Sequence, residues 1–263
     1  MANTTGVGPF RCALVTGAAG GIGSELCRLL ARDGTALVLL DKNEPGLTQL
    51  RNELGGRVTV DAHVIDLRKL EDLERLLTAI AEQHPTLDLL VGNAGIDHPL
   101  ARFDCNWRTI EDHFATNVSP NVVLCSVFLP RFVAAGRGHV AMVASLGALG
   151  GFPHEGAYSA SKAAVATFTE SLRSEYGPRG ITFTTIFPGF VDTPMLRNNA
   201  FKAPSSLRVP DAAATIYRAL TRRQPTVHFP LSTYLLLCLS RLMPSAVRDY
   251  IARQQMKPEF TPR

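Results

Sequence analysis

Residues 12–23 read CALVTGAAGGIG, and this stretch decides the fold of the chain. A short apolar run, Cys12–Thr16, leads directly into a turn that carries four glycines. The segment Ile22–Arg32 follows, with apolar residues at helical spacing. A buried strand, a glycine-rich turn and an amphipathic helix in this order predict one βα unit.

The same alternation continues to the end of the chain. Helical patterns cover Leu70–Gln83, Trp107–Ala135 and Tyr158–Tyr176. Apolar strands alternating with helices predict a parallel sheet buried on both faces. We therefore expect an α/β fold: residues 1–263 as a single-domain, doubly wound Rossmann-like layer, with residues 231–263 as a hydrophobic and basic extension. The further strands of this seven-stranded sheet are predicted at Thr35–Leu40, Val58–Ile65, Leu87–Val91, His139–Ala144, Ile181–Phe187 and Thr226–Phe229.

Composition excludes several function classes. The 263 residues carry a net charge of +4 with dispersed Lys and Arg, which argues against a nucleic-acid partner. The seven histidines lack metal-ligand spacing, so we expect no metal. We expect no secretory signal at Met1–Phe10 and a cytoplasmic location. Five cysteines, an odd number without paired spacing, fit small core residues in a reducing compartment: Cys12, Cys27, Cys105, Cys125 and Cys238.

The glycine-rich turn predicts an anion site. Gly17, Gly21 and Gly23 permit a tight turn and let a diphosphate approach the backbone, and the following helix offers free N–H groups. A purely structural turn is the alternative.

Asp41 stands at the predicted end of the second strand. A carboxylate there can accept both ribose hydroxyls of an adenosine and would repel a 2′-phosphate. The alternative is a cap for a helix that starts near Glu44. Lys42, the next residue, could tolerate a phosphate or be an ordinary surface lysine.

Tyr158 and Lys162 lie one turn apart on a predicted helix face. A neighbouring cation favours the phenolate, so this tyrosine could exchange protons closer to neutral pH. Ser145 follows a predicted strand and would reach the carboxyl edge of the sheet, where ligands bind in such folds. A turn cap is its other interpretation.

Taken together, these motifs resemble the classical short-chain dehydrogenase/reductase family over roughly residues 10–230. One departure is Gly92, where many members have a second asparagine. The motifs in the family's order are Gly17, Gly21 and Gly23, then Asn93-Ala94-Gly95, Asn117, Ser145, Tyr158 with Lys162, and Pro188-Gly189.

The resemblance implies a catalytic set of four residues. Tyr158 would be the acid–base, and Lys162 would lower its pKa and hold the nicotinamide ribose. Ser145 would bind the substrate oxygen, and Asn117 would kink a long helix and position a water in a proton relay to Lys162.

The resemblance also implies a cofactor site. Asp66, with Leu67 beside it, would meet the adenine, and Asn93 would brace the central strands. Thr193 would bond to the carboxamide or the diphosphate. The cofactor-binding residues implied are Gly17, Gly21, Ile22, Gly23, Asp41, Asp66, Leu67, Asn93, Ala94, Gly95, Tyr158, Lys162, Pro188, Gly189, Val191 and Thr193.

These residues predict an NAD(P)(H)-dependent oxidoreductase that acts on a hydrophobic secondary alcohol or ketone. Asp41 favours NAD over NADP as the cofactor. The alternatives are an NADPH-dependent reductase of 3-oxoacyl or sterol-like ketones and a non-catalytic dinucleotide-binding regulator. His154 is either a substrate contact or an exposed loop residue.

Two segments outside the motifs carry further expectations. Phe190–Pro210 suits a lid over the substrate or a plain surface loop. Leu231–Met243 and the basic amphipathic helix Ser245–Lys257 would pack in the core or at a subunit interface, line a hydrophobic substrate mouth, or contact a membrane peripherally. A homodimer or homotetramer is expected along the helices of Asn117 and Tyr158. Its apolar surface would come from Phe114, Val122, Val123, Phe128, Phe132, Val165 and Phe168.

Overall fold

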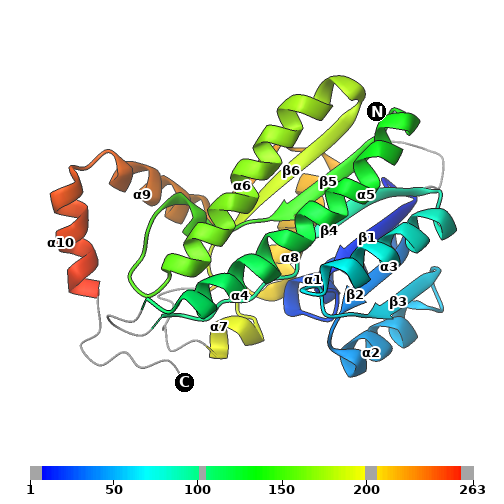
Figure 1. The fold of residues 1–263 in the computed structure, drawn as a ribbon, viewed down its shortest axis with the longest axis horizontal. Coiled ribbons are helices and arrows are strands. Elements are labelled where there is room, and N and C mark those ends of the chain that lie inside the picture. Colours follow the sequence, from blue (N-terminus) through cyan, green and yellow to red (C-terminus); the bar gives the residue numbers. More distant parts are fainter. Residues whose placement is uncertain (1–7, 101–104, 199–205, 256–263) are drawn as a thin grey trace.

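A computed structural model describes residues 8–100, 105–198 and 206–255. Its strands form the predicted seven-stranded parallel sheet, and their order is β3-β2-β1-β4-β5-β6-β7 (Figure 1). The first half contains β1 (Cys12–Thr16), β2 (Ala36–Asp41) and β3 (Val60–Val64). The second half contains β4 (Leu87–Gly92), β5 (Gly138–Val143), β6 (Ile181–Pro188) and β7 (Thr226–Phe229).

The strand order reverses beside β1, which pairs with β2 on one side and with β4 on the other. The connection from β1 leads to β2 on one side, and the connection from β4 leads to β5 on the other side. The carboxyl ends of β1 and β4 therefore border a crevice. Every residue of β1 is buried, as expected for a central parallel strand covered on both faces. The fold therefore offers a ligand site at this edge.

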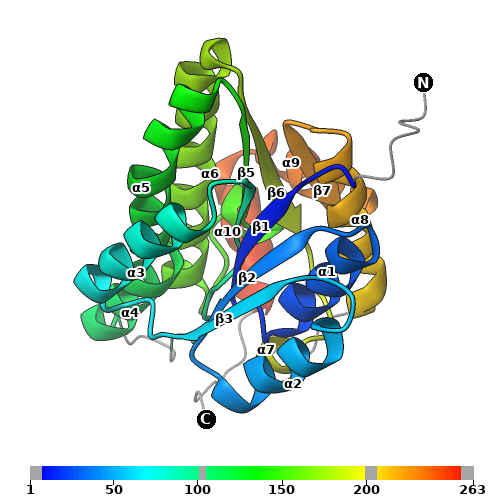
Figure 2. The ribbon, with the colours of Figure 1, turned by 90° about the vertical axis from the view of Figure 1, so that its right-hand side faces the viewer.

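Helices cover both faces of the sheet (Figure 2). One layer contains α3 (Leu70–Gln83), α5 (Ser119–Ala135) and α6 (Gly156–Tyr176). The opposite layer contains α1 (Gly21–Arg32), α2 (Glu44–Leu54) and α8 (Val209–Thr221).

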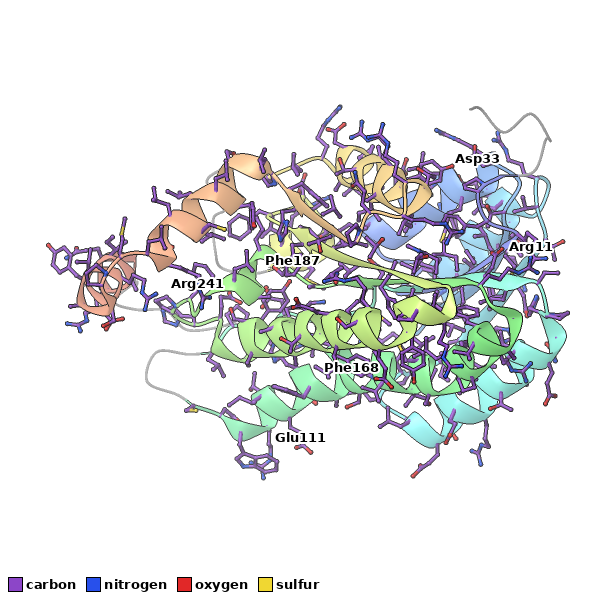
Figure 3. The ribbon with its side chains drawn as sticks, turned by 90° about the horizontal axis from the view of Figure 1, so that it is seen from above. Arg11, Asp33, Glu111, Phe168, Phe187 and Arg241 are labelled. Carbon is purple, nitrogen blue, oxygen red and sulfur yellow. The ribbon has the colours of Figure 1, made fainter. Side chains whose placement is uncertain are left out.

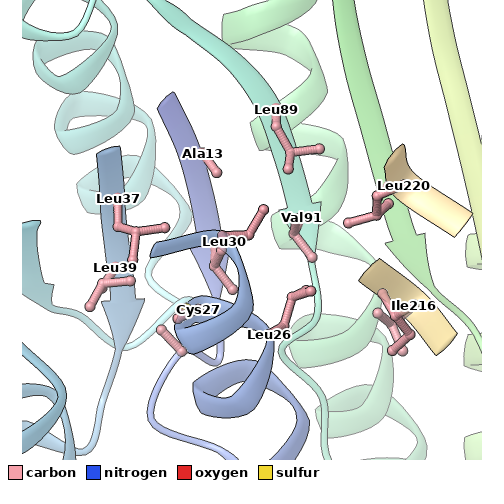
Figure 4. Packing of buried hydrophobic residues seen from close by; sticks show 14 of the residues in the cluster. Ala13, Leu26, Cys27, Leu30, Leu37, Leu39, Leu89, Val91, Ile216 and Leu220 are labelled. Carbon is pink, nitrogen blue, oxygen red and sulfur yellow. The ribbon is translucent and has the colours of Figure 1, made fainter. Parts of the chain in front are cut away.

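The second layer is joined to the sheet by close apolar packing (Figure 4). Leu26 and Leu30 of α1 are fully buried in the same cluster as Val91 of β4. Ile216 and Leu220 of α8 complete this core. Because α1 is fixed in this way, its N-terminus stays at the carboxyl edge of β1.

The predicted long helix Trp107–Ala135 is divided at Val118 into α4 (Trp107–Asn117) and α5. Pro120 in the first turn of α5 has no N–H to donate, so the helical hydrogen-bond ladder is interrupted there. The whole stretch is long and apolar enough to cross a membrane. In this fold, however, α5 packs on α3 and buries Leu124 and Phe128 in the core.

The remaining described elements lie near the crevice or beyond it. The expected lid contains α7 (Pro194–Asn198) and the start of α8, while residues 199–205 lie outside the described residues. The short 3₁₀ turns are η1 (Leu146–Leu149) and η2 (Gly177–Arg179). After β7, α9 (Leu231–Arg241) and α10 (Ser245–Gln255) extend away from the sheet (Figure 1). Met256 and Lys257, predicted to end the last helix, lie outside the described residues.

Candidate active site

A cavity of about 680 Å³ opens at the carboxyl edge of the sheet. The turn after β1, the ends of β2, β4, β5 and β6, and the beginning of α6 line it. Gly23 and Asn117 were expected in the site but lie behind its lining. The predicted residues that do line it are Gly17, Gly21, Ile22, Asp41, Asp66, Leu67, Asn93, Ala94, Gly95, Ser145, Tyr158, Lys162, Pro188, Gly189, Val191 and Thr193.

The glycine-rich turn is closely packed against itself. Gly17 adopts φ +63°, a conformation that favours glycine. A Cβ on Gly23 would overlap the Gly17 carbonyl oxygen and lie 3.0 Å from its carbonyl carbon. Gly23 therefore lets the turn close tightly, as the sequence predicts, while its contact with a cofactor stays a prediction.

The first turn of α1 is open to an anion. Its N-cap residue is Gly20, which has no side chain that could cap the helix. The first N–H groups of a helix have no partner within the helix. These donors and the positive end of the helix dipole suit a diphosphate. The turn thus fits the phosphate part of a dinucleotide.

Asn93 braces the two central strands, as the sequence predicts. Its Nδ2 donates to the carbonyl oxygens of Thr16 at 3.0 Å and Gly17 at 3.1 Å. The Thr16 hydroxyl in turn accepts from the backbone N–H groups of Asn93 and Ala94. These bonds fix the turn after β1 to the end of β4.

Asp41 ends β2 with its carboxylate beside the glycine-rich turn. Its Oδ2 accepts from the Ala19 N–H and its Oδ1 from the Asn43 N–H, both at 2.9 Å. The helix-cap interpretation of Asp41 is wrong, because Asn43 caps α2 by accepting from the Gly46 N–H. Asp41 is therefore held in place at the cavity wall.

A cation that sequence analysis missed lies near Asp41. Arg68 lines the cavity and donates to both carboxylate oxygens of Asp66, with a shortest distance of 2.7 Å. Hydrogen bonds from this guanidinium hold the pKa of Asp66 at about 2. Lys42 also contributes to this lowering, so both cations lie on this wall.

Ser145 and Tyr158 come together where β5 ends and α6 begins. Their hydroxyls lie close enough to interact, and Ser145 Oγ accepts from the Gly147 N–H at 3.0 Å. Lys162 Nζ donates to the Val143 carbonyl at 2.9 Å and lies 5.9 Å from the centre of the Tyr158 ring. A hydroxyl pair and an amine thus share one end of the cavity.

Burial governs the ionisation of this end. It raises the pKa of Tyr158 above its usual range, although the interaction with Ser145 partly offsets the effect. It also lowers the pKa of Lys162 to about 8. Desolvation of the phenol is thus the dominant effect on the Tyr158 pKa in this structure, and the expected lowering by Lys162 stays a prediction.

Asn117 is buried behind Lys162 at the end of α4. Its Nδ2 donates to Ser161 Oγ at 2.9 Å, and its Oδ1 accepts from the Ile96 N–H at 2.8 Å. The expected helix break is present. Its role in a water relay remains a prediction.

Asn121 explains the departure at Gly92. Asn121 Nδ2 donates to the Asn117 carbonyl at 2.8 Å, where the helix is broken. A Cβ on Gly92 would overlap Asn121 Oδ1 and lie 3.1 Å from its Cγ. Glycine at position 92 therefore makes room for a side chain that stabilises the break. The sequence contained Asn121, but the contact joins separate elements.

The opposite wall carries a carboxyl pair that sequence analysis also missed. Asp97 and Glu155 both line the cavity, and the charge of Asp97 acts on the Glu155 carboxyl. Burial, reinforced by Asp97, raises the pKa of Glu155 to about 9. Glu155 therefore holds a proton at neutral pH.

Two histidines complete this region. His113 is fully buried, and its ring centre lies 6.5 Å from that of Tyr158. Its Nδ1 bonds to the Thr109 carbonyl at 2.7 Å, and burial lowers its pKa. His154 lines the cavity, where its Nδ1 bonds to the Leu100 carbonyl at 3.0 Å. The first histidine supports the tyrosine, and the second borders the substrate side.

Comparison with known proteins agrees with this geometry. The family model of the short chain dehydrogenases matches residues 11–203. An uncharacterized oxidoreductase of Myxococcus xanthus is 32% identical over 246 residues, covering 93% of this chain and 97% of the relative. The chain belongs to the short-chain dehydrogenase/reductase family and is an NAD(P)-dependent oxidoreductase.

Two solved structures are similar as well. A short-chain dehydrogenase of Sphingobium yanoikuyae in complex with NADPH has a TM-score of 0.78 at 23% identity, covering 96% of this chain and 99% of that one. An alcohol dehydrogenase of Thermococcus sibiricus complexed with 5-hydroxy-NADP has a TM-score of 0.74 at 25% identity, covering 83% of this chain and 94% of that one. The fold of this chain is thus that of known dehydrogenases.

Proposed function

We propose that this protein interconverts a hydrophobic secondary alcohol and its ketone, with Tyr158 as the acid–base. The observation that carries the proposal is the Ser145–Tyr158 hydroxyl pair, which faces the same cavity as the glycine-rich turn. A nicotinamide held in that cavity would supply or accept the hydride. The proton must then come from, or go to, a group of the protein.

Each residue of the pair has a separate task. Ser145 Oγ would donate to the substrate oxygen and stabilise the negative charge that develops there. Tyr158 would give its proton to that oxygen during reduction and take it back during oxidation. Lys162, one helical turn away, would hold the cofactor ribose and place positive charge near the phenol when protonated.

The substrate end of the cavity supports a hydrophobic substrate. Its apolar lining comes from three separate parts of the chain, so a bulky apolar group would be surrounded on several sides. These lining residues are Phe152 after η1, Phe190, Met195 and Leu196 around α7, and Leu237 on α9.

The proposal includes a preference for NAD(H) over NADP(H). Asp41 presents a fixed carboxylate where the adenosine ribose would lie, so a 2′-phosphate would meet a like charge. The Arg68 guanidinium is already engaged by Asp66. The NADP derivative in the Thermococcus sibiricus neighbour weighs toward the opposite preference, so the two cofactors need direct comparison.

The decisive experiment is turnover of a panel of alcohols and ketones with each cofactor. We expect nicotinamide-dependent turnover of bulky apolar secondary alcohols or ketones, and little turnover of small polar ones. Preference for NADPH and 3-oxoacyl or sterol-like ketones would favour the reductase alternative. Cofactor binding without turnover of any compound would instead indicate a dinucleotide-binding regulator.

We also propose a homodimer or homotetramer in the cytoplasm. All five cysteines are free, which fits a reducing compartment. Of the expected interface residues, Val122 is exposed. Phe128, Phe132 and Val165 are buried in the chain's own core, so the expectation that they form interface surface is wrong. Light scattering that gives only the 28.5 kDa mass of one chain would contradict the oligomer.

A further inference from the structure

The helix α9 is firmly attached to the fold by its inner face. The Tyr234 ring stacks on that of His228 at 3.9 Å, and the His228 ring stacks on that of Phe187 at 4.6 Å. Leu237 packs against the buried cluster that contains Leu146 and Phe187. Figure 3 shows Phe187 near the base of α9 and Arg241 where α9 meets α10. The inner face of α9 is thus packed against the fold.

The outer face of α9 is apolar and uncovered. Leu231, Leu235 and Leu239 recur every four residues and are 61%, 56% and 57% exposed. Leu236 beside them is 65% exposed, and Leu242 just past the helix is 82% exposed. No charged residue occurs from Leu231 to Ser240. A helix that is apolar on its outer face as well as its inner face is normally covered by something.

The next helix, α10, carries further exposed apolar residues. Val247, Tyr250 and Ile251 are exposed at the spacing of one helix face. Together with the leucines they form what we call the arm face: Leu231, Leu235, Leu236, Leu239, Leu242, Val247, Tyr250 and Ile251.

Exposed basic residues accompany the arm face. Arg241, Arg248 and Arg253 are exposed, and Asp249 is the only acidic residue between Leu231 and Gln255. Arg241 donates to the Leu149 carbonyl, which ties the end of α9 to the η1 turn. The surface therefore combines apolar area with an excess of positive charge.

We infer that the arm face docks on the surface of an anionic lipid bilayer. Each helix has 11 residues, too few to span a membrane but suited to lie in its interface. Leucines would enter the acyl boundary while the arginines meet lipid phosphates. A second copy fits less well, because a two-fold interface would bring two sets of three arginines together with only two Asp249 carboxylates.

Docking would also determine how the substrate arrives. Thr233 and Leu237 on the inner face of α9 line the cavity. A bilayer against the outer face would therefore lie one helix diameter from the substrate end. This role in substrate delivery rests on the proposed function. The substrate would then be a lipophilic alcohol or ketone that partitions into lipid. The docking itself does not depend on catalysis.

The test is sedimentation of the full chain with vesicles, without cofactor or substrate. The vesicles contain phosphatidylcholine alone or an equal mixture with phosphatidylglycerol. We expect binding to the mixed vesicles that weakens as salt is raised. Leu235→Glu with Leu239→Glu should lower this binding at least about tenfold, because two leucines that would enter the bilayer are lost. The matched control, Val64→Glu with Leu70→Glu, alters exposed apolar residues elsewhere and should bind like the wild type.

A second pair of variants tests the charges without altering the apolar surface. Arg248→Gln with Arg253→Gln should reduce binding to the mixed vesicles severalfold, whereas Arg32→Gln with Arg57→Gln should not. Absence of binding to mixed vesicles overturns the inference. So does a dimer that the leucine variant dissociates while vesicles stay unbound, since the arm face would then join two copies. Equal binding to both vesicles at all salt concentrations overturns the anionic requirement.

Discussion

The two walls of the cavity differ in how they are built. On the cofactor wall, Gly17, Gly23 and Asn93 are held by backbone contacts and hydrogen bonds between neighbouring strands. On the substrate wall, burial and the charge of Asp97 raise the pKa of Glu155. The first wall is fixed by backbone geometry, so a single methyl group disturbs it. The second depends on side chains and their ionisation, so its substitutions should alter specificity and pH dependence before they alter the fold.

The largest effect is expected from Gly23→Ala on the cofactor wall. The added methyl would overlap the Gly17 carbonyl, and backbone cannot move aside as a side chain can. We expect a loss of about 1–3 kcal/mol in the free energy of unfolding, together with weaker binding of both cofactors. Urea unfolding and cofactor titration measure the two effects. Gly56→Ala, where a Cβ meets open space, is the control. Unchanged binding and stability would show that the turn is not rigid.

A smaller effect on the same wall is expected from Asp41→Ala. Unit charges 4 Å apart at an effective dielectric of 20 repel by about 4 kcal/mol before screening. We therefore expect wild-type protein to bind NAD(H) at least about tenfold more tightly than NADP(H), which needs only about 1.4 kcal/mol. Titration of both cofactors should show that Asp41→Ala shrinks or reverses this preference. Adding Lys42→Ala should then weaken NADP(H) alone. Equal affinities in the wild type would contradict the role of Asp41.

The smallest effect at neutral pH is expected from Glu155→Gln on the substrate wall, because both side chains are uncharged there. The folded protein holds this carboxyl's pKa at about 9, above its usual value, so the folded state binds the extra proton. The free energy of unfolding should therefore fall as pH rises from the usual carboxyl pKa of 4.5 toward about 9, by at most about 1.4 kcal/mol per pH unit. Gln removes the titration and should flatten the dependence. Urea unfolding across the window measures it, with exposed Glu74→Gln as control. An unchanged slope would mean that Glu155 is ionised in the folded protein.

The same contrast explains what could be predicted from the sequence. The strands follow from local apolar runs, and β1 and β7 coincide with their predicted bounds. The cofactor wall was predictable because glycines and strand ends are read locally. Asp41 illustrates the limit, because only the structure shows that Asn43, and not Asp41, caps α2.

The substrate wall could not be predicted because it depends on residues far apart in the sequence. Asp97 follows β4 and Glu155 precedes α6, and only the tertiary fold makes them partners. His113 and Asn121 are similar cases, since His113 lies beside the Tyr158 ring and Asn121 lies against Gly92. Tyr158 is a further case, because the sequence shows the nearby lysine but not the burial that raises the pKa of the phenol.

The central claim is that Tyr158 transfers the proton while the cofactor wall binds the dinucleotide independently. Tyr158→Phe removes one hydroxyl and keeps the ring beside His113. Turnover of the best substrate from the panel and cofactor affinity should be measured on the same samples. We predict that turnover falls by at least about 10²–10⁴-fold, with cofactor affinity nearly unchanged. Wild-type turnover by the variant would contradict the account, because another group would then be the acid–base.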